Sequence, residues 1–293
     1  MSMNERDDVE KRKMTTYAFH QVDVFAAAPL KGNPLAVVAG ADGLDDARMA
    51  AFANWMNLSE TTFLLEPTVP GADYRVRIFT PEEELPFAGH PTLGSCHVWL
   101  AMGGVPQGRD VVQECGAGLV TVRREGDVLA FAAPPLRRAG AVDAADLAVV
   151  TRLLGLSPDG VIAANWVDNG PGWLGLMLRD REELLALRPD SQALAGWNVG
   201  LVAPWNPLRD GDAAQFEVRA FTGGAAVFED PVTGSLNAGL AKWLIECGLA
   251  PHAYIASQGT VLGRMGRVRV ARDEAGIWVG GETVTRISGQ VTL

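Results

Sequence analysis

Cysteine, histidine and long apolar runs are all scarce in this 293-residue chain, and each scarcity excludes a class of protein. The three cysteines, Cys96, Cys115 and Cys247, form no CxxC pair and no even set, which argues against structural zinc and a disulfide scaffold. We expect buried thiols that pack as small hydrophobes. The four histidines show no metal-ligand spacing, so we expect no metal centre from His20, His90, His97 and His252.

Basic residues are fewer than acidic ones, 25 against 35, and they form no cluster. A net charge of −10 without a basic patch argues against a nucleic-acid partner. The apolar runs are short and interrupted by Gly, Pro or charge, so we expect no membrane span. Residues 1–14 are charged and lack the apolar core of a secretory signal, which predicts a disordered tail and a cytoplasmic protein.

Nucleotide and hydrolase motifs are missing as well. No GxGxxG follows a strand, and neither GxxxxGK[ST] nor a GxSxG elbow occurs. We therefore expect no cofactor, and acid–base chemistry by side chains remains as the simplest catalytic class.

What the chain does contain is an internal duplication. Residues Glu84 to His90 (ELPFAGH) and Glu229 to Ser235 (EDPVTGS) share one pattern, and each leads into an almost uncharged helical run. Flanking elements repeat in the same order, with a separation that grows from 141 residues at Asn57 and Asn198 to 148 residues later in the chain. Such a repeat predicts two lobes built on one plan.

The two uncharged runs, residues 91–102 and 235–247, predict buried helices because they are apolar nearly all round. Short segments that alternate apolar and polar residues, such as Tyr74 to Ile78, predict half-buried strands. An amphipathic outer helix is predicted from Asp45 to Met56, with Asn57 as its stop. The expected fold is therefore α+β, with two pseudo-symmetric lobes, each a mixed, curved β-sheet wrapped around a central buried α-helix.

The predicted boundary between the lobes falls near the Pro134-Pro135 pair. The N-terminal lobe then comprises residues 15–134, and the C-terminal lobe comprises residues 135–281. The last segment, residues 282–293, has no counterpart in the plan of the second half, and we expect it to return to the N-terminal lobe.

The glycines at the starts of the two buried helices, Gly89 and Gly234, indicate an anion site. The first N–H groups of a helix have no intrahelical acceptor and lie at the positive end of the helix dipole. His90 and Ser235 occupy matching positions after these glycines, so both side chains are candidates for the mouth of a cleft between the lobes. Helix capping is an equally good explanation for Ser235.

Two carboxylates break the pseudo-symmetry. Glu60 opens the apolar stretch Thr61 to Leu65, and sequence alignment of the halves places Leu201 at the equivalent position. A carboxylate at a strand start facing a cleft is partly desolvated, which raises its pKa and suits it to proton transfer near neutral pH. Asp230 stands where the first copy has Leu85. A capping or surface role for Glu60 and a turn role for Asp230 are the alternatives.

These residues carry a resemblance to a known family. The chain resembles the PhzF family of phenazine-biosynthesis-like isomerases over almost its whole length after the tail. The resemblance lies in an ordered set of short motifs: Val22-Asp23-Val24-Phe25, Gly32-Asn33-Pro34, Asn57-Leu58-Ser59-Glu60-Thr61, Phe79-Thr80-Pro81, Glu84 to Pro91, Glu229 to Ser235 and Ser257-Gln258-Gly259. One departure is Gly263-Arg264-Met265-Gly266, where the family often has Gly-Arg-Pro-Ser.

The resemblance implies a fold similar to diaminopimelate epimerase, an active site between the lobes, a homodimer and no cofactor. It implies that Glu60 shuttles a proton as acid and base, as in isomerisation of a dihydro-hydroxyanthranilate, with His90 and Asp230 around the substrate. Together with Gly89, Gly234 and Ser235, they would bind a small anionic, carboxylate-bearing metabolite. The substrate itself is not implied by the fold.

Two other functions stay open at this point. The epimerases place a cysteine before each helix-leading glycine, where this chain has Ala88 and Thr233. An amino-acid epimerase dependent on thiols would therefore need different cysteines. A ligand-binding or scaffold protein that kept the fold and lost catalysis is the second alternative, and the retained Glu60, His90 and Asp230 argue against it.

Overall fold

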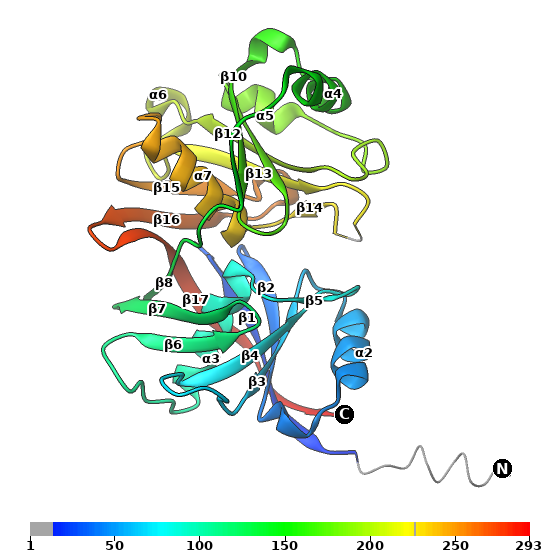
Figure 1. The fold of residues 1–293 in the computed structure, drawn as a ribbon, viewed down its shortest axis with the longest axis vertical. Helices are drawn as coiled ribbons and strands as arrows, with labels where there is room; N and C mark the ends of the chain where they lie inside the picture. Colours follow the sequence, from blue (N-terminus) through cyan, green and yellow to red (C-terminus); the bar gives the residue numbers. More distant parts are fainter. Residues whose placement is uncertain (1–13, 226) are drawn as a thin grey trace, which may run out of the picture.

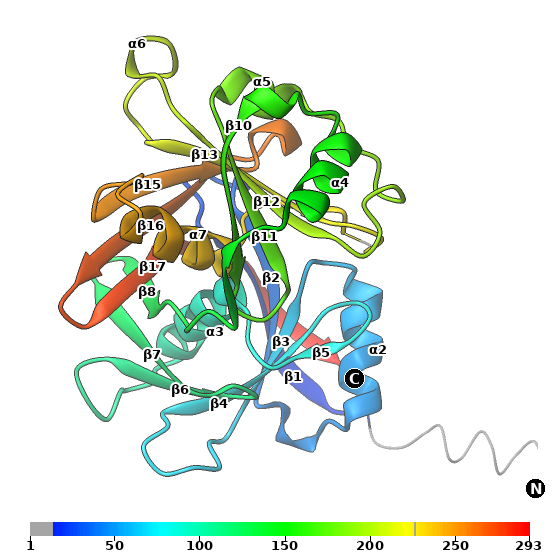
Figure 2. The ribbon, with the colours of Figure 1, turned by 45° about the horizontal axis from the view of Figure 1, so that its top comes forward.

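A computed structural model describes residues 14–225 and 227–293, so the predicted tail lies outside the described residues except for Met14, which is exposed. The molecule has two lobes, one above the other in Figure 1, and each is a curved sheet around one helix. The helices at the two centres, α3 (Gly89–Ala101) and α7 (Gly234–Glu246), contact each other near the boundary of the lobes (Figure 2). The predicted α+β fold with two pseudo-symmetric lobes is confirmed.

The first lobe is a barrel-like sheet whose strands pair in the order β1, β2, β3, β4, β6, β7, β8. The β2–β3 and β4–β6 pairs are parallel and the others antiparallel, so the sheet is mixed as predicted. Its strands and outer helices have the bounds β1 (Thr16–Val24), β2 (Asn33–Ala39), η1 (Ala41–Gly43), α2 (Asp46–Met56), β3 (Thr61–Leu65), β4 (Tyr74–Phe79), β5 (Glu84–Leu85), β6 (Val111–Cys115), β7 (Gly118–Glu125) and β8 (Val128–Ala132).

The second lobe repeats this arrangement, with parallel β11–β12 and β13–β15 pairs in the matching places. Additional short helices cover its outer side (Figure 2). Its remaining elements are β9 (Arg138–Ala141), α4 (Ala144–Leu154), η2 (Pro158–Gly160), β10 (Val161–Asp168), β11 (Trp173–Leu178), α5 (Arg181–Ala186), β12 (Asn198–Pro204), α6 (Pro207–Asp210), β13 (Phe216–Thr222), β14 (Glu229–Asp230), β15 (Ala253–Gln258), η3 (Thr260–Leu262), β16 (Gly266–Asp273) and β17 (Gly276–Thr292).

The lobes exchange strands where they meet. Strand β17 pairs with β16 near its start and with β1 over residues Thr283 to Thr292, so it crosses from the second lobe to the first. In the other direction, the chain leaves β8 and enters β9, which pairs with β10. At the crossing, β8 and β17 pair antiparallel with Phe131 opposite Val279. This pairing joins both barrels into one continuous sheet.

Local signals place the helices that support the site. Helix α2 begins after Asp45, whose carboxylate accepts the N–H of Arg48, and ends at Asn57 in the left-handed conformation, as predicted. Helix α3 is buried over most of its length and is followed by Gly103 at φ +96°. Helix α7 is likewise buried and is followed by Gly248 at φ +68°. Within the described residues no helix is long and apolar enough to span a membrane.

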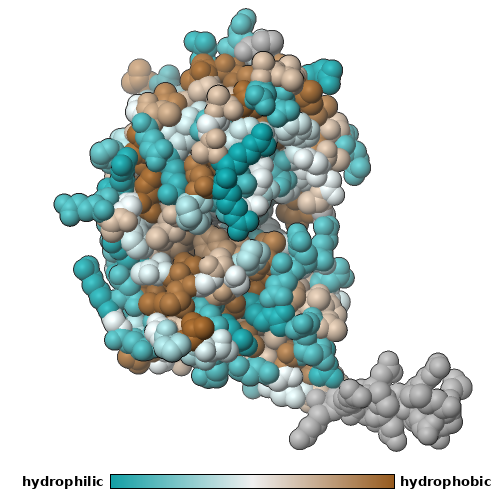
Figure 3. Space-filling view, viewed as in Figure 1, coloured by the Kyte–Doolittle hydropathy of each residue, from teal (hydrophilic) through white to brown (hydrophobic). Residues whose placement is uncertain are grey.

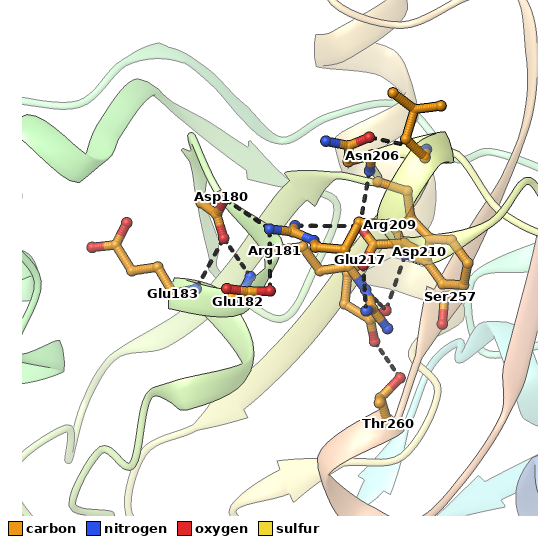
Figure 4. A network of polar contacts seen from close by, with 12 residues as sticks. Asp180, Arg181, Glu182, Glu183, Asn206, Arg209, Asp210, Glu217, Ser257 and Thr260 are labelled. Carbon is orange, nitrogen blue, oxygen red and sulfur yellow. Dashed lines mark hydrogen bonds and ion pairs between the residues drawn. The ribbon is translucent and has the colours of Figure 1, made fainter.

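A buried ion network fixes the outer side of the second lobe (Figure 4). Glu217 on β13 is fully buried and accepts hydrogen bonds from Arg181 Nε at 2.9 Å and from Trp205 Nε1 at 3.1 Å. Arg181 also pairs with Asp210 at 3.2 Å and stacks over the Trp205 ring. The charges of this network satisfy one another, so we assign it a structural role.

Candidate active site

The two helix-leading glycines lie against each other at the boundary of the lobes. A Cβ built on Gly89 would stand 2.8 Å from Gly234 Cα and 2.7 Å from the tip of the Phe131 ring. Only glycine permits this approach, and it brings the starts of α3 and α7 together. In the described part of the chain, no hydrogen bond is formed by the backbone N–H groups of Gly89, His90, Gly234 and Ser235.

Glu60 lies directly before β3, and its side chain is 14% exposed. Its Oε2 atom is 3.5 Å from His90 Nδ1, at the start of α3. Burial raises the pKa of Glu60 well above its ordinary value, and the negative charge of Asp230 raises it further. The carboxyl group therefore keeps its proton to a higher pH than a solvated glutamate does.

The predicted equivalence of Glu60 and Leu201 is wrong. Strand pairing places Thr61 opposite Phe79, and in the second lobe it places Val199 opposite Phe221, the repeat partner of Phe79. The residue that precedes Val199 is Asn198, which lines the same cavity as Glu60. The pseudo-symmetry is thus broken because the first lobe has a carboxylate at the position where the second lobe has an amide.

His90 is a neutral imidazole at physiological pH, because burial lowers its pKa to about 3. Asn33 Nδ2 lies 3.4 Å from His90 Nδ1, but its two hydrogens are taken by closer acceptors, Asp230 Oδ1 at 2.9 Å and Val232 O at 3.0 Å. His90 Nδ1 is therefore left facing the Glu60 carboxyl. Among the described residues, neither Glu60 Oε2 nor His90 Nε2 has a hydrogen-bond partner.

Asp230 is held from both lobes. Its carboxylate accepts from Asn33 Nδ2 at 2.9 Å, from Ser59 Oγ at 3.0 Å and from Thr233 Oγ1 at 2.6 Å. Its backbone carbonyl accepts from Gln258 Nε2 at 3.1 Å. Burial raises the pKa of Asp230 while these three donors lower it, so the carboxylate is both desolvated and well hydrogen-bonded.

Ser235 makes no helix cap in this structure, and its Oγ instead accepts from Trp173 Nε1 at 3.1 Å. The adjacent turn between β10 and β11 is tied to it, because Asn169 Nδ2 donates to Ser235 O at 2.8 Å. Ser235 is half-buried, so its hydroxyl stands at the start of α7 with an orientation fixed by Trp173.

A cavity of about 950 Å³ opens between the lobes over this cluster. Glu60, Asp230 and Ser235 line it, together with Asn169, Trp173 and Asn198 and with the segment from Ala132 to Arg137. Gly89, His90 and Gly234 are buried and do not line it, so the expected place of His90 at the cleft mouth is corrected to one behind Glu60. In Figure 3, apolar surface gathers at mid-height of this face, between the two lobes.

Sequence reasoning missed the four residues that hold Asp230 in place: Asn33, Ser59, Thr233 and Gln258. Each of the four lies within one of the short motifs of the resemblance, and that membership was the available signal. Asn33 contacts Asp230 across 197 residues of chain, so its partner follows from the lobe arrangement alone.

The cysteines stand apart from this cluster, and none of them lines the cavity. Cys96 and Cys115 are buried as expected, and burial raises the pKa of Cys96 to about 12. Cys247 is exposed, which corrects the expectation of three buried thiols. Within residues 14–225 and 227–293, no group of three or more His, Cys, Asp or Glu side chains is placed to hold a metal ion.

Comparison with known proteins agrees with the fold. A model of the PhzC-PhzF family, described as phenazine biosynthesis-like protein, matches residues 22–290. The chain is 35% identical to "Antisense-enhancing sequence 1" of Schizosaccharomyces pombe over 94% of this chain and 99% of that protein. It is also 35% identical to the trans-2,3-dihydro-3-hydroxyanthranilate isomerase of Pseudomonas fluorescens, over 83% of this chain and 86% of that one.

A solved structure gives the same result. The crystal structure of a phenazine biosynthesis protein of the PhzF family from Enterococcus faecalis matches with a TM-score of 0.77 and 26% identity, covering 95% of this chain and all of that one (100%). The chain therefore belongs to the PhzC-PhzF family. It is an isomerase of that family.

Proposed function

We propose that the protein isomerises a small, carboxylate-bearing metabolite by moving a proton between two carbon atoms, with Glu60 as the acid and base. The observation that carries this proposal is the placement of Glu60: its carboxyl lines the cavity, lies 3.5 Å from the neutral imidazole of His90, and has a raised pKa. A carboxyl group of this kind can take and return a proton near neutral pH.

The proposed reaction is balanced within the substrate and one side chain. The ionised Glu60 takes a proton from a substrate carbon, and the electron pair of that C–H bond spreads into the adjacent unsaturated system and carboxylate. Glu60 then returns the proton to a second carbon, which restores its carboxylate. Acid–base catalysis of this kind contributes about 10²- to 10⁴-fold in rate.

The starts of α3 and α7 are the proposed anion site, with the start of α7 reaching the cavity through Ser235 and the buried start of α3 lying behind it. Their N–H groups and helix dipoles stabilise negative charge, each helix end contributing about 0.3–2 kcal/mol. Ser235 lines the cavity at the start of α7 and is the hydroxyl that we propose contacts the carboxylate. In this scheme His90 orients Glu60, and Asp230 orients polar groups of the substrate and tunes Glu60.

The relatives narrow the proposal to a substrate class. The Pseudomonas fluorescens relative is named for a cyclic amino carboxylate, trans-2,3-dihydro-3-hydroxyanthranilate. We propose a cyclic or amino-acid-like carboxylate for this chain too, in a cytoplasmic enzyme that forms homodimers. A two-thiol epimerase is disfavoured because Ala88 and Thr233 precede the glycines and no cysteine lines the cavity.

Deuterium wash-in from heavy water tests the proposal. The protein is incubated in D₂O with a panel of cyclic and amino-acid-like carboxylates, and incorporation at carbon is followed by NMR and mass spectrometry. We expect enzyme-dependent incorporation into at least one compound. Binding of panel members without any exchange would instead identify a ligand-binding protein with this fold.

A further inference from the structure

Arg137 lies where the chain crosses from β8 to β9, on the wall of the cavity. Its backbone N–H donates to Asp168 O at 2.7 Å, and Pro134 and Pro135 restrict the chain just before it. Its exposed side chain reaches over Gly170, where a Cβ would be 4.0 Å from the guanidinium carbon. The crossover thus presents Arg137 at the turn between β10 and β11.

Hydrogen bonds hold that turn together and join it to the start of α7. The carboxylate of Asp168 accepts from Gly170 N at 2.7 Å and from Gly172 N at 2.6 Å, which closes the turn. Asn169, which directly precedes Gly170, donates from Nδ2 to Ser235 O at 2.8 Å. The guanidinium of Arg137 lies over Gly170, the adjacent residue Asn169 is hydrogen-bonded to Ser235, and both Arg137 and Ser235 line the cavity.

The charges around the cavity single out this arginine. Four carboxylates line it, those of Glu60, Glu82, Glu83 and Asp230, and among the lining residues that the structure describes Arg137 is the one cation. Ionised carboxylates repel an anion, so Arg137 is the side chain of this described lining whose charge attracts one.

The guanidinium of Arg137 is also free to bind a ligand. Within the described residues it makes no ion pair, no side-chain hydrogen bond and no ring contact. Its neighbour Arg138 stacks over the Trp166 ring at 3.3 Å, and Arg219 pairs with Glu229 at 2.8 Å. Since an arginine fork matches a carboxylate in a bidentate manner, a free one in a cavity is suited to an anionic substrate group.

We infer that Arg137 is the specificity-determining residue that pairs with the substrate carboxylate on the α7 side of the cavity. The inference rests on the proposed function, from which it takes a carboxylate-bearing substrate. Beyond that function, it names the residue that selects the carboxylate. With the anion held between Arg137 and the start of α7, the rest of a small substrate extends toward Glu60. Neutral analogues lose this pairing and bind weakly.

Isothermal titration of the full-length protein tests the inference without turnover. The probes are benzoate and 3-hydroxyanthranilate, each compared with its uncharged amide. We expect wild type to bind the acids more tightly than the amides. In R137Q, which keeps a polar side chain but removes the positive charge, we expect the Kd of each acid to rise by about 10- to 100-fold while the amides are unaffected. R138Q is the matched control. We expect it to leave the Kd of the acids and of the amides unchanged, because Arg138 stacks over the Trp166 ring and does not line the cavity.

Three results would overturn the inference: an unchanged Kd for the acids in R137Q, an equal loss for acids and amides, or no preference of wild type for acids. Equal urea midpoints for wild type, R137Q and R138Q show that all three are folded. This readout is separate from the proposed function. If deuterium exchange requires Glu60 but the Kd of the acids is unchanged in R137Q, only the inference about Arg137 is refuted. If the acids bind more weakly to R137Q but wild type exchanges no deuterium into any of the compounds, only the proposed reaction is refuted.

Discussion

Gly89 and Gly234 lie back to back, so that a Cβ built on either would stand 2.8 Å from the Cα of the other. Both belong to the duplicated pattern, and both begin a buried helix. Their contact lies beside the Phe131–Val279 pairing at which the two lobes exchange strands. The close contact between the backbones at Gly89 and Gly234 therefore brings the starts of α3 and α7 together.

Alanine at either glycine is expected to destabilise the protein. In G89A the new methyl group overlaps both Gly234 and the Phe131 ring, and relief requires the lobes to separate. We expect a loss of about 1–3 kcal/mol in the free energy of unfolding, measured by urea denaturation. G108A is the control, since a Cβ there meets nothing within 4 Å. A G89A variant with the wild-type midpoint would contradict the packing described here.

Replacing Glu60 by glutamine is expected to abolish exchange and leave the fold intact. The amide keeps the shape of the side chain but cannot accept and return a proton. We expect a loss of at least about 10²-fold in deuterium incorporation. Far-UV circular dichroism and an acid-binding titration of E60Q check that the site persists. Exchange at the wild-type rate in E60Q would remove Glu60 from the mechanism.

The same variant has an expected effect on stability. Because the pKa of Glu60 is raised in the folded state, the folded protein binds up to one more proton than the unfolded chain at pH values between the ordinary pKa and the raised one. Its contribution to stability is present at low pH and falls as pH rises through the folded pKa. Urea midpoints from pH 4 to 9 should therefore decline more steeply in wild type than in E60Q. Parallel curves would contradict the raised pKa.

His90 gives the opposite pH dependence. Its pKa in the folded protein is lowered to about 3, whereas an unfolded chain protonates this residue near pH 6.5. Between those values only the unfolded state binds the proton, so stability is lost as pH falls, by about 1.4 kcal/mol for each unit. Denaturation of wild type and H90N at pH 7, 6 and 5 measures this, and we expect a shallower slope in H90N. Equal slopes would mean that His90 is accessible to protons in the folded state.

Removing the charge of Asp230 is expected to shift the pH dependence of exchange. The Asp230 carboxylate raises the pKa of Glu60, so D230N lowers that pKa. The limb of the pH–rate profile that reports Glu60 ionisation should then move to lower pH. S59A is the control, since it removes one donor to Asp230 and keeps the carboxylate. An unmoved limb in D230N would separate Asp230 from the ionisation of Glu60.

Thiol alkylation is expected to leave exchange unchanged. Cys247 is exposed and reacts, whereas burial raises the pKa values of Cys96 and Cys115 and protects them. Since no cysteine lines the cavity, treatment with iodoacetamide should label Cys247 without affecting deuterium incorporation. Inactivation in proportion to labelling would favour the thiol-dependent epimerase.

Elements governed by local signals could be predicted from the sequence. The bounds of α2 follow from the cap at Asp45 and the stop at Asn57, and the burial of α3 and α7 follows from their uncharged stretches. The hydrogen-bond partners of the site residues could not be predicted from the sequence, because they depend on how the two lobes meet. Asn33 reaches Asp230 from the other lobe, and no local pattern encodes that contact.

The error at Leu201 has a similar origin. Matching Asn57 with Asn198 by sequence aligns a helix stop with the first residue of β12. Strand register, which is set by hydrogen bonding to β4 and β13, shifts the true equivalent of Glu60 to Asn198. Where the two halves differ in the length of a connection, strand pairing therefore identifies equivalent residues more reliably than a short sequence similarity does.

The crossing of β17 also constrains the order of assembly during synthesis. Residues Thr283 to Thr292 complete the barrel that begins with β1, so that barrel stays open until nearly the whole chain has left the ribosome. Contacts of such long sequence separation form slowly, and an open sheet edge exposes the nascent chain to aggregation. A nascent chain that stalls before residue 283 would therefore require chaperones for its first half as much as for its second.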